Sequence, residues 1–100
     1  MAKEVIWSET AQNDRKEIFT YWNNRNKSTL YSEKLNGLFN AAAEIIATHP
    51  QIGKLSGYRD TRMKIVRDYL IVYKEFAEYI SIITIWGWNQ DPEKLKELLK

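Results

Sequence analysis

The sequence of 100 residues contains no cysteine, one histidine and only four glycines, and each scarcity excludes a kind of chemistry. Without thiols the chain forms neither disulfides nor thiolate sites, and one histidine does not supply a structural zinc site. The glycines are scattered, so there is no glycine-rich phosphate loop. His49 precedes Pro50 at an expected helix end, which suits a capping or solvated histidine rather than a catalytic one. We therefore expect no metal and no cofactor.

Long apolar runs are also missing. The longest stretch, near Ile80 to Trp86, is far too short to span a bilayer, and residues 1–4 lead directly into a strand-like run without an apolar signal segment. These features and the lack of cysteine predict a cytoplasmic protein with no membrane partner. A hydrophobic content of 44% in 100 residues suits one core, so we expect a single domain over residues 1–100.

The hydrophobic pattern predicts an α+β fold with the element order β-α-α-β-β-β and a short C-terminal helix. Ser8 and Ser28 are suitable N-caps for two helices, and Asp91 followed by Pro92 begins the last one. We expect the helical hairpin to pack on one face of a mainly antiparallel sheet, leaving the other face partly open. The expected elements are a strand at 4–7, helices at about 9–24 and 28–48, a loop at 50–60, strands at about 62–67, 69–76 and 79–86, and a helix from residue 92.

Positive charge is concentrated in one segment. Between Lys54 and Arg67 there are five basic residues and one acid, whereas the rest of the chain has ten basic and twelve acidic residues. Arg62 and Lys64 are two apart, so a strand places them on one face. If the alternate residues pack on the helices, these cations point to the open face and attract phosphate or an acidic peptide. The alternative is an ordinary solvated sheet face. The candidate partner- or anion-binding residues are Lys54, Arg59, Arg62, Lys64, Arg67, Trp86, Trp88 and Asn89.

Other polar and aromatic groups have two interpretations. A tryptophan in the run Trp86-Gly87-Trp88 would stack on a base or anchor a protein partner if exposed, and would otherwise belong to the core. The carboxylate pairs Asp14/Glu17 and Glu75/Glu78 are expected to be a solvated helix face and a turn, because nothing apolar nearby indicates a raised pKa.

Taken in order, six stretches resemble the RelE/ParE family of bacterial type II toxins: Val5-Ile6-Trp7-Ser8, Tyr21-Trp22, Tyr31-Ser32-x-Lys34-Leu35, His49-Pro50-Gln51-Ile52-Gly53, Lys64 to Tyr73, and Gln90 to Leu95. The resemblance covers nearly the whole chain and agrees with the element order above. It implies a growth-inhibiting toxin of the plasmid-stabilisation type. It also implies a cognate antitoxin that wraps around the toxin, in a heterotetramer or larger complex.

The resemblance leaves the target open. RelE-like members cut messenger RNA on the ribosome with basic sheet residues, and ParE-like members act on DNA gyrase without that basic set. Arg62 and Lys64 match two lysine positions of the RelE pattern, but Leu70 stands where RelE-like chains carry arginine. The arginine after the last strand falls near Asn89, and residues 92–100 contain no tyrosine.

The depleted cation set and the run His49 to Gly53 favour a ParE-like toxin that binds gyrase. One alternative is a ribosome-dependent mRNA endoribonuclease, with Arg62, Lys64 and Arg67 as catalytic candidates and the ribosome and mRNA as partners. A further alternative is a non-toxic module that keeps only antitoxin binding. We expect the antitoxin to cover the open sheet face and the helical hairpin.

Overall fold

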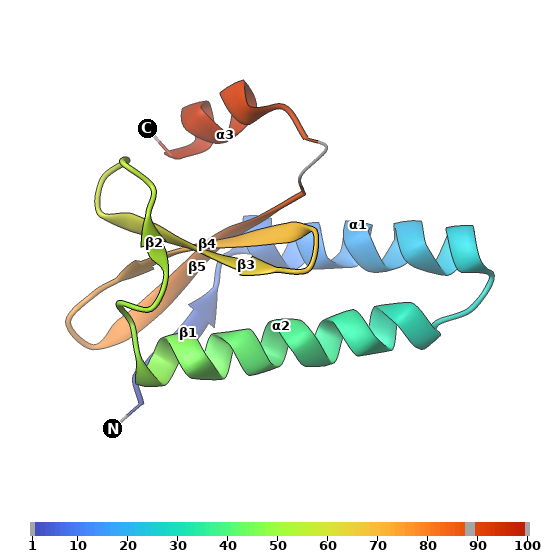
Figure 1. Cartoon of the computed structure of the whole chain (residues 1–100), viewed down its shortest axis with the longest axis horizontal. Coiled ribbons are helices and arrows are strands. Elements are labelled where there is room, and N and C mark those ends of the chain that lie inside the picture. The colour runs from blue at the N-terminus through green and yellow to red at the C-terminus, as the bar shows by residue number, and fades with distance from the viewer. Residues whose placement is uncertain (1, 88–89, 100) are drawn as a thin grey trace.

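The computed structural model describes residues 2–87 and 90–99, and its elements follow the predicted order (Figure 1). The predicted α+β class is confirmed. The elements are β1 (Glu4–Trp7), α1 (Glu9–Asn26), α2 (Leu30–Thr48), β2 (Lys54–Leu55), β3 (Thr61–Val66), β4 (Tyr69–Glu75), β5 (Tyr79–Gly87) and α3 (Pro92–Leu99). The two-residue strand β2 lies inside the stretch expected to be a loop, because a strand this short has no alternating pattern to reveal it.

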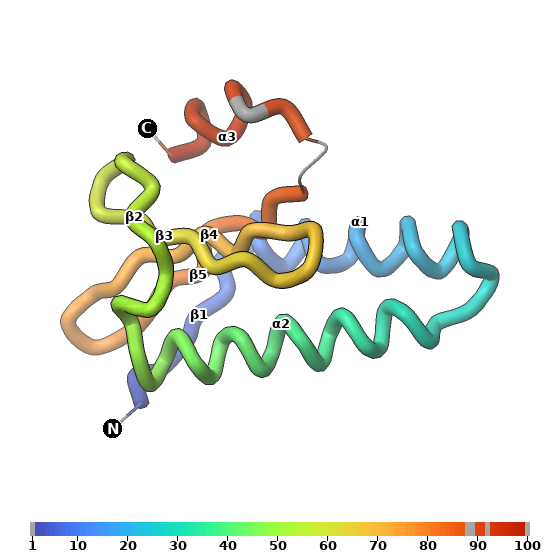
Figure 2. Tube along the Cα trace, viewed as in Figure 1, coloured from blue at the N-terminus to red at the C-terminus, as the bar shows by residue number. Residues whose placement is uncertain are grey.

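The sheet has five strands in the order β1-β5-β4-β3-β2. β1 runs parallel to β5, and the other neighbours are antiparallel, so the sheet is mixed but mainly antiparallel. The α1–α2 hairpin separates β1 from the other strands in sequence and packs on one face of the sheet. α3 lies on the opposite side, as the trace in Figure 2 shows.

The core lies between the helical hairpin and the sheet. Leu35, Phe39 and Ile46, at helical spacing on α2, are fully buried. They meet buried side chains of the central strands, chiefly Ile71, Tyr73, Ile80, Ile82 and Ile85. Each large apolar side chain buried in this way contributes about 1.5–3 kcal/mol relative to an exposed one. The strong periodicity of α2 is therefore the main sequence signal for this layer.

A short polar residue stands at the start of each long helix, but only that of α1 caps through its side chain. The predicted N-cap Ser8 accepts a hydrogen bond from the Ala11 backbone N–H at 3.0 Å and donates to the Ile83 carbonyl at 2.7 Å, so it joins α1 to β5. The prediction of Ser28 as the second N-cap is wrong by one residue. Thr29 occupies that position, and the Ser28 hydroxyl accepts from the Leu30 N–H at 3.2 Å.

Asp14 is part of the fold and not the solvated carboxylate expected from the sequence. The pairing of β1 with β5 reaches only Trp7 opposite Ile82, and α1 then follows the same edge of β5. There the Asp14 carboxylate accepts hydrogen bonds from the Ile85 backbone N–H at 3.0 Å and the Thr84 hydroxyl at 2.5 Å. A helix side chain thus satisfies an edge N–H that a longer β1 would have paired.

Candidate functional site

Arg62 and Lys64 lie on the helix-covered face of the sheet. Arg62 is opposite Tyr73, and Lys64 is opposite Ile71, and both of these partners belong to the core. Residues directly opposite each other on antiparallel strands share a face. The predicted orientation toward the open face is therefore wrong, and Met63 and Ile65 occupy the other face instead.

Arg62 helps to hold the loop that leaves α2. Its guanidinium donates from Nη1 to the Gly53 carbonyl at 2.8 Å and to the Gln51 carbonyl at 3.3 Å. Beside it, the Tyr73 hydroxyl donates to the Pro50 carbonyl and accepts from the Gly53 N–H, both at 2.8 Å. Burial raises the pKa of Tyr73, and the Gly53 hydrogen bond and the nearby Arg62 charge oppose that rise. The charge of Arg62 is thus engaged with loop carbonyls.

The remaining cations of the basic segment come from several elements. Lys54 is exposed on β2, and Arg59 lies in the turn between β2 and β3 with a φ of 46°. Arg67 is exposed in the two-residue turn between β3 and β4 with a φ of 56°. Lys64 and Arg67 both line a cavity of about 270 Å³ between α2 and β3.

The opposite face of the sheet, beside α3, has an apolar strip flanked by polar residues: Lys54, Thr61, Lys74, Ser81 and Thr84. Leu70 lies opposite Trp86, and Met63 lies opposite Val72. Val72 is fully buried whereas Ile65 is 71% exposed, so this face is covered at its centre and partly open, as expected, toward β3. Trp86 is half-buried, and its indole Nε1 is buried without a hydrogen-bond partner in the part of the chain that the structure describes. Trp88 and Asn89 lie outside the described residues.

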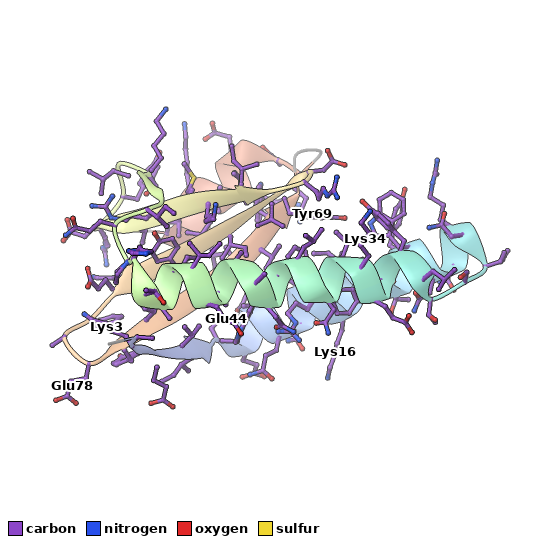
Figure 3. The ribbon with its side chains drawn as sticks, turned by 60° about the horizontal axis from the view of Figure 1, so that its bottom comes forward. Lys3, Lys16, Lys34, Glu44, Tyr69 and Glu78 are labelled. Atoms are coloured by element: carbon purple, nitrogen blue, oxygen red, sulfur yellow. The ribbon has the colours of Figure 1, made fainter. Side chains whose placement is uncertain are left out.

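A cavity of about 490 Å³ lies between α1 and the ends of β4 and β5. Trp22 and Tyr69 both line it, and the Trp22 indole donates from Nε1 to the Tyr69 hydroxyl at 2.8 Å. Figure 3 shows Tyr69 where the sheet meets the hairpin. Burial raises the pKa of Tyr69, and the hydrogen bond from Trp22 opposes that rise. The charged residues lining this cavity are three carboxylates and one guanidinium: Asp14, Glu17, Asp68 and Arg25. This lining does not suit a phosphate.

Residues 2–87 and 90–99 contain neither a metal-binding cluster nor a membrane-spanning helix. No group of three His, Cys, Asp or Glu side chains is placed to hold a metal ion in that part of the chain. None of the helices described there is long and apolar enough to cross a membrane.

Comparison with known proteins gives a consistent family. Residues 5–92 match the model of the "ParE toxin of type II toxin-antitoxin system, parDE". A chain of the chromosomal ParDE toxin–antitoxin system from P. aeruginosa superposes with a TM-score of 0.75 at 12% identity, covering 86% of this chain and 96% of that one. A mutant of E. coli toxin RelE in the free state superposes with a TM-score of 0.68 at 16% identity, covering 99% of this chain and 95% of that one. No curated protein sequence matches the chain. At these identities the two structures support the fold alone.

Proposed function

Because the chain belongs to the ParE toxin family of type II toxin–antitoxin systems, we propose that it is a growth-inhibiting toxin that binds DNA gyrase. The observation that carries the proposal is the orientation of β3. Arg62 turns toward the helices and engages loop carbonyls, and Leu70 and Trp86 occupy the face beside α3. The strand cations described on that face are Lys54, opposite Met63, and Lys74, opposite Thr61 and Ser81, and neither lies beside Leu70.

The physical argument concerns the charge that develops during RNA cleavage. Attack by a 2′-hydroxyl on the adjacent phosphate builds negative charge, and fixed cations or donors supply most of its stabilisation. Loss of one such donor typically costs a factor of roughly 10²–10³ in rate. Leu70 offers neither charge nor hydrogen bond, so a binding mechanism fits this surface better than a cleavage mechanism.

The test is a supercoiling assay with gyrase from the source organism. Purified toxin should block supercoiling in proportion to its concentration, and prior addition of the antitoxin should restore it. Normal supercoiling at saturating toxin would refute gyrase as the target. Heat-denatured toxin at the same concentration is the control for nonspecific loss of supercoiling activity.

A ribosome-dependent endoribonuclease is the second candidate, favoured by one observation. Two cations of the predicted catalytic set, Lys64 and Arg67, line the same cavity. Programmed ribosomes would then yield cuts in the A-site codon that disappear with Lys64→Ala. Intact message at high toxin concentration would contradict this candidate. If induction of the toxin gene alone leaves growth unchanged, the chain is instead a non-toxic antitoxin-binding module.

The family implies an antitoxin partner. We propose a cytoplasmic complex, a heterotetramer or larger, in which the antitoxin covers exposed parts of the sheet and the helical hairpin. Size-exclusion chromatography with light scattering on the co-expressed pair measures the stoichiometry. A mass equal to one toxin and one antitoxin would contradict the larger assembly.

A further inference from the structure

The cavity of about 490 Å³ between α1 and the ends of β4 and β5 has aromatic walls. Tyr21 and Trp22 of α1 and Tyr69 of β4 line it. The Tyr21 and Trp22 rings have centroids 5.1 Å apart and an interplanar angle of 86°, so they form a corner rather than a stack. The Trp22 indole N–H donates to the Tyr69 hydroxyl, which joins the helix wall to the sheet wall. These aromatic walls are therefore held in place by the fold itself.

The charged side chains of this cavity make it electronegative. Asp14 and Glu17 of α1 and Asp68 of the turn between β3 and β4 carry three negative charges, and Arg25 carries one positive charge, which leaves a net charge of −2. The Asp14 carboxylate is already hydrogen-bonded to β5. Glu17 and Asp68 are exposed and form no ion pair within residues 2–87 and 90–99. Their oxygens are therefore available to a cationic ligand.

Arg25 shows that a guanidinium is accommodated against this aromatic wall. Its Cζ lies 6.0 Å from the centroid of the Trp22 ring, at the outer limit of a cation–π contact. Arg25 is exposed and forms no ion pair in the part of the chain that the structure describes. The chain's own cation therefore lies over Trp22 without neutralising Glu17 or Asp68.

The lining distinguishes among ligand classes. Its net negative charge repels phosphates and carboxylates. Its carboxylates do not suit a metal ion, since the described residues include no group of three such side chains placed to hold one. A guanidinium matches both parts of the lining, because it is planar, stacks on aromatic faces and presents N–H groups in a fork that fits carboxylate oxygens. A primary ammonium is more strongly hydrated and lacks that planar fork.

We propose that this cavity binds an alkylguanidinium group, packed against the aromatic walls and donating hydrogen bonds to Glu17 and Asp68. Ile18 and Ile85 also line the cavity and accommodate the alkyl chain. A volume of about 490 Å³ lies within the range of small-molecule sites. The group comes from a free guanidino compound or from an arginine side chain of a partner, since both present the same chemistry. The inference is independent of gyrase as the target.

The first experiment is a nuclear magnetic resonance titration of the full ¹⁵N-labelled chain. The probes are agmatine, as a free guanidino compound, and N-acetylarginine amide, as an arginine side chain. The Trp22 indole N–H signal should shift saturably, with a dissociation constant of about 1 mM or below. N-acetyllysine amide, which has the same charge, should bind about threefold or more weakly. Tighter binding of agmatine assigns a free compound, and tighter binding of the arginine amide assigns a protein side chain.

Two results of this titration would overturn the inference. One is the absence of a saturable shift of the Trp22 indole signal with either guanidinium probe. The other is equal affinity for the arginine and lysine amides, because a site that attracts any cation does not recognise the guanidinium fork.

The second experiment removes the two available charges. Glu17→Gln and Asp68→Asn should each raise the dissociation constant for the arginine amide about threefold or more, as expected for exposed charge pairs. Glu9→Gln is the matched control, because it makes the same charge change in the first turn of α1 and does not line the cavity. Its constant should equal that of the wild type. Equal losses for Glu17→Gln and Glu9→Gln would show that only overall charge matters, and would contradict a built site.

The last variant tests the resident cation. Arg25→Ala removes a like charge from the cavity and frees the face of Trp22, so the dissociation constant for the arginine amide should fall about threefold. Lys16→Ala removes the same charge from the outer side of α1, where Lys16 points away from the sheet (Figure 3), and should leave the constant unchanged. An unchanged or higher constant for Arg25→Ala, in a protein that keeps the wild-type circular dichroism spectrum, would refute binding against Trp22.

Discussion

Replacing Tyr73 with phenylalanine tests how the loop after α2 is attached to the sheet. The Tyr73 side chain is fully buried, and its hydroxyl both accepts from the Gly53 N–H and donates to the Pro50 carbonyl. Without it, the buried Gly53 N–H loses its partner at a cost of about 1–3 kcal/mol, and the partly exposed Pro50 carbonyl adds about 0.5–1.5 kcal/mol. We therefore expect Tyr73→Phe to lower the free energy of unfolding by about 2–4 kcal/mol.

The assay is urea denaturation, in which an unchanged slope against urea indicates that the substitution alters stability alone. For a chain of this size the loss corresponds to a fall in Tm of about 10–25 °C. Tyr69→Phe is the matched control, because it removes one hydrogen bond, from Trp22, beside a cavity that water can enter. It should cost only about 0.5–1.5 kcal/mol. Equal losses for the two variants would refute the argument that the loop depends on the Tyr73 hydroxyl.

Three further predictions concern stability. Asp14→Ala should cost about 1–3 kcal/mol in urea denaturation, because it strips a partner from the Ile85 N–H and the Thr84 hydroxyl, whereas Glu17→Ala should stay within about 0.5 kcal/mol. Arg67→Gly should raise the free energy of unfolding by about 1 kcal/mol, since Arg67 has a φ of 56°; an unchanged midpoint would contradict strain in this turn. Burial raises the pKa of Tyr73 above its ordinary 10.0, so the neutral phenol is favoured in the folded state. The stability contributed by the neutral Tyr73 phenol is therefore present below the unfolded pKa and is lost as pH rises through the higher folded pKa. Urea midpoints measured across this pH range should fall less for Tyr73→Phe than for wild type.

Local sequence patterns predicted the elements well, because each signal lay within its own element. The spacing of Leu35, Phe39 and Ile46 marks the buried side of α2, and Ser8 marks the start of α1. Where the boundaries of helices and strands differ from those expected, they differ by one or two residues. Only β2 was missed, being too short to show a period.

The orientation of β3 could not be predicted from β3 alone. Alternation separates Arg62 and Lys64 from Met63 and Ile65 but does not say which pair faces the helices. The more apolar pair was assigned to the core. The outcome is decided by β4, whose Ile71 and Tyr73 are buried and lie opposite Lys64 and Arg62. Register depends on tertiary pairing. Arg62 and Lys64 therefore lie on the predicted strand but on the opposite face of the sheet from the one expected.

The role of Asp14 was hidden for a different reason. Its partners Thr84 and Ile85 are 70 and 71 positions away along the chain, and no local pattern connects them. A carboxylate two turns into an amphipathic helix has the same local sequence whether it is solvated or caps a distant strand. Only the structure shows that the β1–β5 pairing ends at Ile82 and that Asp14 bonds the edge beyond it.

The parallel pairing of β1 with β5 has a consequence for synthesis. The first strand and the N-cap of α1 dock on the last strand, with the Ser8 hydroxyl bonded to a carbonyl 75 positions later. A nascent chain that has not yet been translated through β5 lacks the surface on which its own N-terminal segment is seated, and such non-local pairings form slowly. The finished fold therefore arises only near the end of translation, and prematurely terminated chains remain without it.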